Sequence, residues 1–272
     1  MKYPFCYLLS VFLLLSYSVT AQQYDDPSPA HDTFSIYSNH VKEIRNINVW
    51  LPPDYKNGTG TFPVMYMADG GIVQEDFPHI ANTFAELIAE GSISPMILVG
   101  IQNTQRRRDL TGATEVAADK EIAPIVGGSA NFRAFIKDEL IPEIDKRYRT
   151  NNKKGILGES LSGLFVMETF LRTPEMFDYY IAFDPSLWWN NHFLVRNAND
   201  LLTNFPKDDK VLWFAASGVR GMATDTKSLA KVLQKKNLQN LRWTYVSAPK
   251  EKHNTIFRAT KVQALKWALG KQ

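Results

Sequence analysis

A serine within residues 155–163 stands where a nucleophile would be expected. The segment reads Gly-Ile-Leu-Gly-Glu-Ser-Leu-Ser-Gly, and we interpret it as the end of an apolar strand, a turn at Ser160 and the start of a helix. A hydroxyl on such a turn is accessible to a base, and the N–H groups of the following helix point at charge that develops there. Gly158 fits the Gly-x-Ser-x-Gly pattern, whereas Ser162 replaces its second glycine. The pattern predicts a nucleophile, and an ordinary Gly/Ser-rich helix start is the alternative.

A histidine near the end of the chain could activate this serine. A neutral serine is a poor nucleophile and needs a base within hydrogen-bond reach. Of the five histidines, His253 is the one that follows the last expected strand and precedes the last helix. A histidine that comes last in the order serine, acid, histidine is typical of catalytic triads on a parallel sheet. We therefore predict His253 as the base; the alternative is a surface loop residue.

Three carboxylates are candidates for the acid that orients the imidazole. The usual place is the loop after the strand at 210–216, but that loop carries Arg220 where an acid is expected. Asp184, at the end of the preceding strand, is our first choice, Asp225 the second and Glu251 the third. The alternative role of Asp184 is that of a turn residue, and that of Asp225 is a helix cap.

Two backbone amides are expected to bind the oxyanion of an acyl-transfer reaction. One is the N–H of Leu161, the residue after the nucleophile, and the other should follow the strand at 62–68. There Gly71 is our first choice and Gly70 the alternative, because two glycines let the backbone approach closely. The loss of one such donor costs about 3 kcal/mol of transition-state stabilisation.

The apolar pattern predicts the sheet that must position these residues. Alternating apolar residues indicate two antiparallel strands at 34–37 and 45–51. A continuous apolar run at 62–68 is typical of a strand buried on both faces, and further strands then alternate with amphipathic helices. The predicted strands lie at 62–68, 96–101, 154–158, 179–183, 210–216 and 241–246, and the helices at 76–90, 131–148, 161–171, 224–236 and 256–269. This order predicts an α/β fold with a mostly parallel sheet, antiparallel N-terminal strands and helices on both faces. Ligands bind beyond the carboxyl ends of such strands.

The first residues predict export. A positive start, a short apolar run and small residues before Ala21 indicate a signal peptide at 1–21. A flexible lead-in at 22–32 and a single catalytic domain at 33–272 should follow. The only cysteine, Cys6, lies in the signal, so the mature chain would have no disulfide and no thiol nucleophile. We expect a periplasmic or extracellular protein without stable membrane insertion after cleavage.

The composition limits the kinds of binding partner that the chain is expected to have. With 44% hydrophobic and 22% charged residues the chain is ordinary for a packed globule, and a net charge of +3 does not favour nucleic acid. The arginines at 106–108, beside Asp109, are interpreted as a loop that orients an anionic or polar group. No metal or other cofactor is expected, and the oligomeric state is left open.

The chain resembles the esterase family of α/β hydrolases, which contains enterochelin-type siderophore esterases, S-formylglutathione hydrolases and feruloyl or acetyl xylan esterases. The matching segments are 45–52, 63–70, 108–111, 135–148, 158–165 and 185–189, and the siderophore-esterase-like branch is the most similar. The resemblance implies an α/β-hydrolase fold with Ser160 as nucleophile and His253 as base. This branch often has an acid just after the position of Gly218 and a serine at that of Asp184. This exchange of residues suggests that the acid has moved from the end of the strand at 210–216 to the end of the strand at 179–183, or that a Ser–His dyad operates.

Residues near these strand ends could bind the substrate. Trp188 and Trp189 would form an aromatic wall of the pocket or pack in the core. Arg108 and Asp109 could close one side of it.

The prediction is an exported serine hydrolase that cleaves carboxylic esters through an acyl-enzyme at Ser160. A siderophore lactone or an acylated carbohydrate is the expected substrate. One alternative is an acyltransferase that uses the same triad. The other is a catalytically silent glycan- or siderophore-binding protein, which Ser162 and the missing acid favour.

Overall fold

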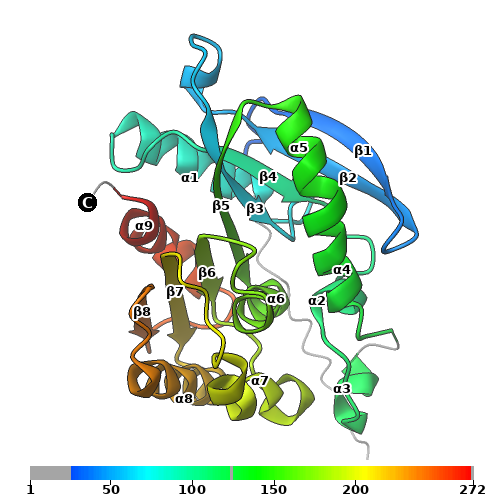
Figure 1. Cartoon of the computed structure of the whole chain (residues 1–272), viewed down its shortest axis with the longest axis vertical. Coiled ribbons are helices and arrows are strands. Elements are labelled where there is room, and N and C mark those ends of the chain that lie inside the picture. Colours follow the sequence, from blue (N-terminus) through cyan, green and yellow to red (C-terminus); the bar gives the residue numbers. More distant parts are fainter. Residues whose placement is uncertain (1–25, 123–124, 271–272) are drawn as a thin grey trace, which may run out of the picture.

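One sheet of eight strands carries the fold of the protein. The structure is a computed structural model that describes residues 26–122 and 125–270 (Figure 1). The strand order is β1-β2-β4-β3-β5-β6-β7-β8; β1, β2 and β4 pair antiparallel and all further neighbours pair parallel. The strands are β1 (Asp32–Ser38), β2 (Glu43–Trp50), β3 (Phe62–Met67), β4 (Ile97–Ile101), β5 (Thr150–Glu159), β6 (Tyr179–Phe183), β7 (Lys210–Ser217) and β8 (Leu241–Ala248). The predicted fold class is confirmed.

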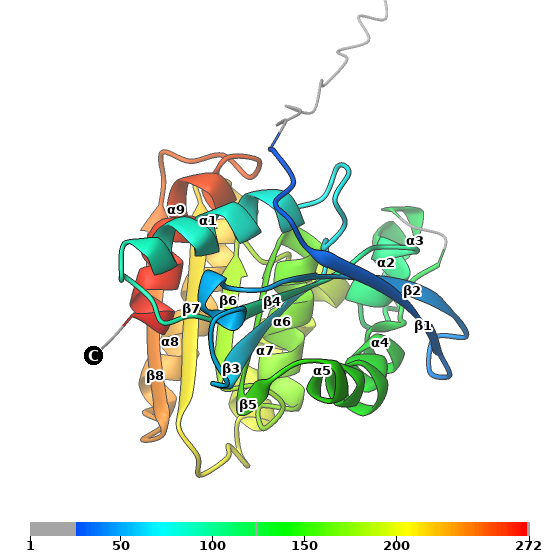
Figure 2. The same cartoon turned by 90° about the horizontal axis from the view of Figure 1, so that it is seen from above.

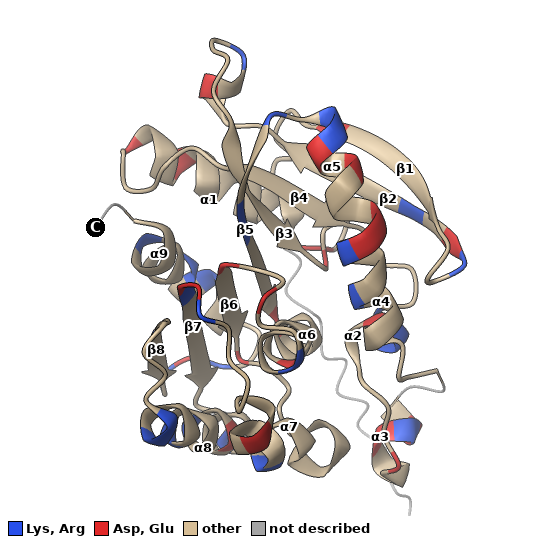
Figure 3. Cartoon of the chain, viewed as in Figure 1, with Lys and Arg blue, Asp and Glu red and all other residues tan. Residues whose placement is uncertain are grey.

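The central strands are apolar because helices cover both of their faces. β3, β4 and β6 contain no charged residue, and charges gather on the outer helices (Figure 3). Along β3, Val64 and Tyr66 pack into one core cluster, whereas Met65 and Met67 pack into the other. This alternation is the two-residue period of a strand, so each face of the sheet has its own apolar core.

Helices cover both faces of the sheet. α1 (Phe77–Ala89) and α9 (Ile256–Leu269) lie side by side on the first face (Figure 2). The second face is covered by α4 (Ser129–Phe135), α5 (Ile141–Arg147), α6 (Ser160–Arg172), α7 (Trp189–Leu201) and α8 (Arg220–Lys236). α6 packs on β5 and β6, and therefore holds its N-terminus at the carboxyl ends of the parallel strands.

The helix expected at 131–148 contains a π-helical turn, Ile136–Leu140, between α4 and α5. Pro142 follows this turn, has no N–H and crowds the carbonyl of Asp138, four residues earlier. The wider turn accommodates the missing hydrogen bond. The proline thus alters the helix without ending it.

Three helices were not predicted: α2 (Arg106–Leu110), α3 (Ala117–Ile122) and α7. The interpretation of residues 106–108 as a loop is wrong, because they form the first turn of α2. Such short helices depend on tertiary contacts rather than on their own propensity.

The described part of the lead-in, residues 26–31, is anchored to the domain, in contrast to the loose attachment expected for 22–32. Asp26 pairs with Arg258 of α9, and the Pro27 carbonyl accepts a hydrogen bond from Asn82 of α1 at 2.9 Å. The predicted signal peptide lies outside the described residues. No helix in the described part of the chain is long and apolar enough to cross a membrane.

Candidate active site

Ser160 lies on a strained turn between β5 and α6. Its φ of 58° is left-handed, a conformation that non-glycine residues seldom adopt and that active sites often retain. The turn is tight: a Cβ on Gly158 would lie 2.5 Å from the Ser162 hydroxyl, and one on Gly163 would lie 3.0 Å from a carbonyl of β6. The sequence segment therefore forms the predicted elbow, with the serine at its apex.

Ser162 has its own structural role at this elbow. Its hydroxyl accepts a hydrogen bond from the Glu159 N–H at 2.8 Å, and the Glu159 side chain accepts one from the Ser162 N–H. The two residues thus form a capping box at the start of α6, which satisfies two amides that a helix end leaves unpaired. The serine at the place of the second glycine therefore stabilises the turn.

The structure brings His253 to the serine. His253 lies in the loop between β8 and α9, and its Nε2 is 2.9 Å from the Ser160 Oγ. Its Nδ1 is 2.7 Å from Oδ2 of Asp184. Both bonds form when Nδ1 carries the proton and Nε2 accepts from the serine hydroxyl, which is the tautomer that a general base needs. Gly218 supports this arrangement, since a Cβ there would lie 2.4 Å from the Pro249 carbonyl of the same loop.

Asp184 is the carboxylate that meets the imidazole. It is fully buried just after β6, with a φ of 42°. Ser217, at the end of the neighbouring β7, donates its backbone N–H to Oδ1 at 2.8 Å and its hydroxyl to Oδ2 at 2.7 Å. Three donors, two from Ser217 and one from His253, therefore fix the position of the carboxylate. Ser217 was not predicted as a functional residue; the available signal was a serine at the end of the strand that precedes the loop in which an acid was expected.

The other two candidate acids bond elsewhere. Asp225 accepts a hydrogen bond from His192 Nδ1 at 2.9 Å, and the Glu251 carboxylate accepts one from the Thr255 hydroxyl at 2.7 Å. Glu251 thereby stabilises the turn that carries His253. The geometry places neither carboxylate on the imidazole.

Both glycine amides proposed for the oxyanion already have acceptors. The Gly70 N–H donates to the Ile101 carbonyl at 3.0 Å, and the Gly71 N–H donates to Oε2 of Glu75 at 2.7 Å. Glu75 also accepts the Asn103 N–H at 3.3 Å. Burial raises the pKa of Glu75, and the charge of Asp69 adds to the effect. An oxyanion could therefore use the Gly71 amide only after Glu75 has moved.

Several carboxylates crowd the entrance to α6. Asp69 is held by Arg106, with Nη2 2.8 Å from Oδ2, and by Asn103. Burial opposes the ionisation of Asp69, but Arg106 outweighs it and lowers the pKa. Burial, and then the charges of Asp76, Asp69 and Asp184, raise the pKa of Glu159 to about 8. At neutral pH the residue before the nucleophile is therefore mostly uncharged.

This raised pKa makes stability depend on pH. The folded protein holds a proton on Glu159 up to a pH of about 8, whereas the unfolded chain releases it near 4.5. The contribution of this bound proton to the free energy of unfolding is therefore fully present below pH 4.5. It is lost as the pH rises to about 8, at about 1 kcal/mol per pH unit. We expect Glu159→Gln, which keeps the acceptor of the capping box, to flatten the decline of the unfolding free energy between pH 5 and 8. Urea unfolding at several pH values between 5 and 8 measures this decline for the variant and for wild type.

The matched control for this prediction is Glu115→Gln, at a carboxylate whose side chain is 95% exposed and paired with Lys120. The control should keep the wild-type slope. Equal slopes for wild type and Glu159→Gln would show that Glu159 is ionised in the folded protein at neutral pH.

Arg108 and Asp109 form a buried ion network instead of one side of the site. Asp109 is 1% exposed, and its two oxygens are bound by Arg45 and, at 2.7 Å, by Arg108 Nε. Arg108 also binds Glu43 at 2.6 Å. Both oxygens of Asp109 therefore already have arginine partners, and the geometry does not support its expected contact with substrate. Its neighbour Arg106, which bonds Asp69, is the arginine of this run that belongs to the site.

The two tryptophan rings are in contact, with centroids 5.8 Å apart, but the two side chains line different surfaces. Trp189 lines a pocket beside α6, whereas Trp188 packs half-buried against the main core cluster. The structure thus gives Trp189 the pocket position that both were proposed to share.

The strand order and the place of these residues define the class of the protein. A serine on the elbow after β5, an aspartate after β6 and a histidine after β8 meet at the carboxyl ends of the parallel strands. This is the architecture of α/β hydrolases.

The family follows from comparison with known proteins. A family model described as "Putative esterase" matches residues 38–261, so the chain belongs to this esterase family, whose members are carboxylic ester hydrolases. It is 26% identical over 228 residues to the ferri-bacillibactin esterase BesA of Bacillus subtilis, covering 76% of this chain and 79% of BesA. It is 30% identical over 155 residues to the siderophore triacetylfusarinine C esterase of Aspergillus fumigatus, covering 53% of this chain and only 51% of that protein.

A solved structure supports the fold. An IroE-like serine hydrolase from Shewanella oneidensis superposes with a TM-score of 0.80 at 24% identity, covering 88% of this chain and 79% of the other.

Proposed function

We propose that the protein is a serine esterase that forms an acyl-enzyme on Ser160. The observation that carries this proposal is the continuous hydrogen-bonded chain from Ser160 Oγ through the two nitrogens of His253 to Asp184, at 2.9 and 2.7 Å. The Ser160 hydroxyl proton can move to His253 Nε2 along a hydrogen bond that already exists. Such a chain lets the hydroxyl attack without first forming a free alkoxide.

The reaction proceeds in two halves. The Ser160 oxygen attacks the ester carbonyl carbon while His253 Nε2 takes the hydroxyl proton, and Asp184 stabilises the imidazolium that forms. The tetrahedral intermediate collapses, the bond from carbon to the alcohol oxygen breaks, and His253 protonates the departing alcohol. Water then attacks the acyl-serine with the same proton transfers in reverse order, which releases the acid and restores the hydroxyl.

The oxyanion requires a change at Glu75. The Leu161 N–H at the start of α6 is one expected donor, and Gly71 is the second once its bond to Glu75 opens. The loop that carries Gly71 and Glu75 exposes two apolar side chains, with Ile72 47% and Val73 74% exposed. A substrate that covers this apolar loop would favour a position of Glu75 away from Gly71.

Removal of the competing carboxylate tests this step. We expect Glu75→Ala to raise kcat/KM for a small ester such as 4-nitrophenyl acetate by about 3- to 10-fold, because a charged acceptor no longer competes for the Gly71 amide. Glu75→Gln, a weaker neutral acceptor in the same place, should give an intermediate increase. If kcat/KM falls in both variants while the thermal midpoint also drops, Glu75 supports the loop and does not block it.

For the substrate we propose a siderophore ester or lactone, hydrolysed outside the cytoplasm. Two relatives that align over half or more of the chain are named as siderophore esterases, which supports this class. The signal-peptide pattern at residues 1–21 supports export.

The test combines a mechanism probe with a substrate panel. Wild-type protein is treated briefly with a fluorophosphonate and its intact mass is measured; we expect one adduct. Kinetics are then compared for a catecholate trilactone, a hydroxamate ester siderophore and acetylated xylan. Product analysis with added alcohols distinguishes hydrolysis from acyl transfer. The absence of an adduct would favour a silent binding protein, and a preference for acetylated xylan would replace the siderophore proposal.

A further inference from the structure

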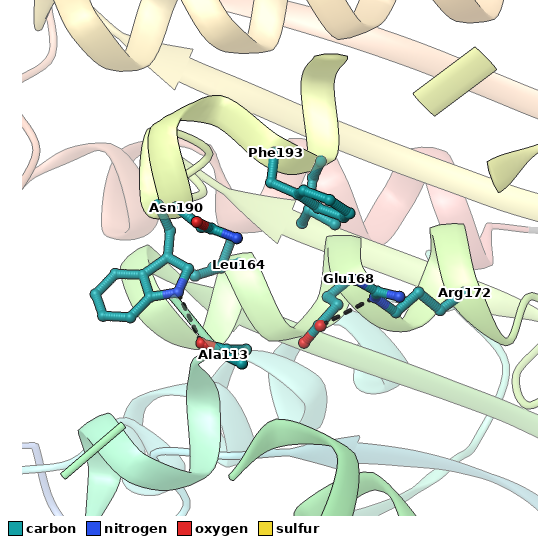
Figure 4. A pocket seen from close by; sticks show the side chains of 9 residues that line it. Ala113, Leu164, Glu168, Arg172, Asn190 and Phe193 are labelled. Atoms are coloured by element: carbon teal, nitrogen blue, oxygen red, sulfur yellow. Dashed lines mark hydrogen bonds and ion pairs between the residues drawn. The ribbon is translucent and has the colours of Figure 1, made fainter. Parts of the chain in front are cut away.

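A pocket of about 260 Å³ opens along the same helix that carries the nucleophile (Figure 4). α6 contributes Leu164, Glu168 and Arg172 to its lining. These three residues follow one another at intervals of four, so they form a stripe along the helix that turns by about 40° per step. Leu164 is one turn beyond Ser160, which is about 6 Å along the helix axis. A substituent of an ester at Ser160 that extends along α6 for about one helical turn would reach Leu164 at the pocket.

The walls of the pocket suit a ring. Trp189 and Phe193 of α7 line it, together with Leu164 and Leu194. The Trp189 indole N–H donates to the Gly112 carbonyl at 2.9 Å, which leaves the ring face as its contact surface. Aromatic side chains at such positions offer flat stacking area to a planar or pyranose ring.

The polar determinant of the pocket is Glu168. Its side chain is only 7% exposed; Oε1 is 3.1 Å from Arg172 Nε, and Oε2 is 3.6 Å from Arg133 Nη1 without a hydrogen-bond partner among the described residues. Gly112 leaves the space for this carboxylate, since a Cβ there would lie 2.9 Å from Oε1. A carboxylate has about four acceptor sites, so Glu168 keeps capacity for a donor from a ligand.

The charges around Glu168 select the kind of donor. Arg133 and Arg172 flank the carboxylate, and the Arg172 guanidinium also lies over the Phe193 ring, 5.3 Å from its centroid. An ammonium group would meet these two cations, and an anionic group would meet the carboxylate. A neutral hydroxyl donates to Glu168 without either conflict.

The wall of the pocket at the start of α7 has a strained backbone. Asn190, Asn191 and His192 all have left-handed φ, at 50°, 50° and 59°, and Asn190 lines the pocket. Asparagine and histidine tolerate this conformation better than most residues. The buried Asp119 of α3 fixes the turn by accepting the Asn190 N–H at 2.8 Å. Strain that the surrounding structure maintains in this way is typical of ligand-binding positions.

We propose that this pocket binds a hydroxyl-bearing ring of the ester substrate, with the ring against Trp189 and Phe193 and its hydroxyl donating to Glu168. The proposal rests on ester hydrolysis at Ser160 and specifies the part of the substrate that the enzyme selects. A phenol and a sugar share this chemistry, and the experiment distinguishes them.

The test uses ester pairs that differ mainly in ring hydroxyls. Methyl 3-(4-hydroxyphenyl)propanoate is compared with methyl 3-phenylpropanoate, and 6-O-acetylglucose with cyclohexylmethyl acetate. We expect the hydroxylated member of at least one pair to have a kcat/KM about 10- to 100-fold higher, as for one hydrogen bond to a charged acceptor. The pair that shows the preference identifies the ring. If the kcat/KM values of the two members agree within twofold in both pairs, the proposal is overturned.

Two variants locate the preference in the pocket. Ala113→Trp fills the pocket from an exposed loop position and leaves the Glu168 ion pairs intact. It should abolish the preference, which is measured as the ratio of kcat/KM between the two members of a pair within the same protein. Ala118→Trp, at an exposed position of α3 outside the pocket, is the matched control and should keep the preference. Glu168→Gln should reduce the ratio of kcat/KM between the hydroxylated ester and its partner, a ratio that a general loss of activity does not change. A preference that survives Ala113→Trp would contradict the proposal.

A binding measurement separates this inference from the proposed function. Calorimetric titration with 3-(4-hydroxyphenyl)propanoic acid and with glucose requires no turnover. Binding that Ala113→Trp abolishes, in a protein that hydrolyses no ester and takes up no fluorophosphonate, would retain the pocket and reject the esterase. Hydrolysis without binding or ring preference would reject the pocket and retain the esterase.

Discussion

Replacement of Ser160 by alanine should lower kcat for ester hydrolysis by about 10⁵- to 10⁶-fold, the loss expected when the nucleophile of a triad is removed. The structure gives the reason: the Ser160 Oγ is the atom within 2.9 Å of the imidazole, and the Ser162 hydroxyl is committed to the backbone of Glu159. No second hydroxyl at the elbow can therefore take over the attack. Initial rates with 4-nitrophenyl acetate and the intact mass after fluorophosphonate treatment measure the effect.

Ser162→Ala is the matched control for this variant. It removes a hydroxyl from the same turn, and with it one half of the capping box, so it should lower stability by about 1 kcal/mol and keep the fluorophosphonate adduct. A Ser160→Ala protein that retained more than about one hundredth of wild-type kcat would place the nucleophile elsewhere.

Asp184→Asn should lower kcat by about 10⁴-fold while the protein stays folded. The amide oxygen can still accept from Ser217, but the amide nitrogen would then face His253 Nδ1 as a donor. The imidazole would adopt the other tautomer, with its proton on Nε2, and could no longer accept the proton of Ser160. The pH profile of kcat, measured with circular dichroism as a check on folding, distinguishes this loss from a structural one.

The competing acids supply the controls. Asp225→Asn and Glu251→Gln should each retain kcat within about tenfold, because these carboxylates bond His192 and Thr255 and not the imidazole. A loss in Asp225→Asn that equalled the loss in Asp184→Asn would contradict the assignment of the acid. Equal rates for wild type and Asp184→Asn would instead support a Ser–His dyad.

The position of the acid explains an unusual feature of the sequence. Asp184 follows β6 and Ser217 ends β7, so the loop after β7 carries no acid for His253 and the carboxylate comes from the neighbouring strand end. The two strands are neighbours in the sheet, and the two side chains bond each other. A carboxylate at either strand end can therefore reach the same imidazole, with the serine as its support.

Much of the fold could be predicted because the determining signals are local. Buried strands such as β3 and β4 are continuous apolar runs, and the helix after Ser160 is marked by the small residues of its turn. α2, α3 and α7 could not be predicted, since their helical state depends on contacts distant in sequence. α7, for instance, begins with three left-handed residues, the first of them held by Asp119.

The sequence by itself determined the class of the fold, the elbow at Ser160 and the candidate base, because periodicity, small residues and chain order are properties of neighbouring residues. Only the tertiary structure decided which carboxylate meets His253, that Glu75 holds the Gly71 amide, and that Glu168 lines a pocket along α6. Each of these is a contact between side chains or amides from different elements. Such contacts depend on how the helices pack on the sheet, and no spacing along the chain encodes that packing directly.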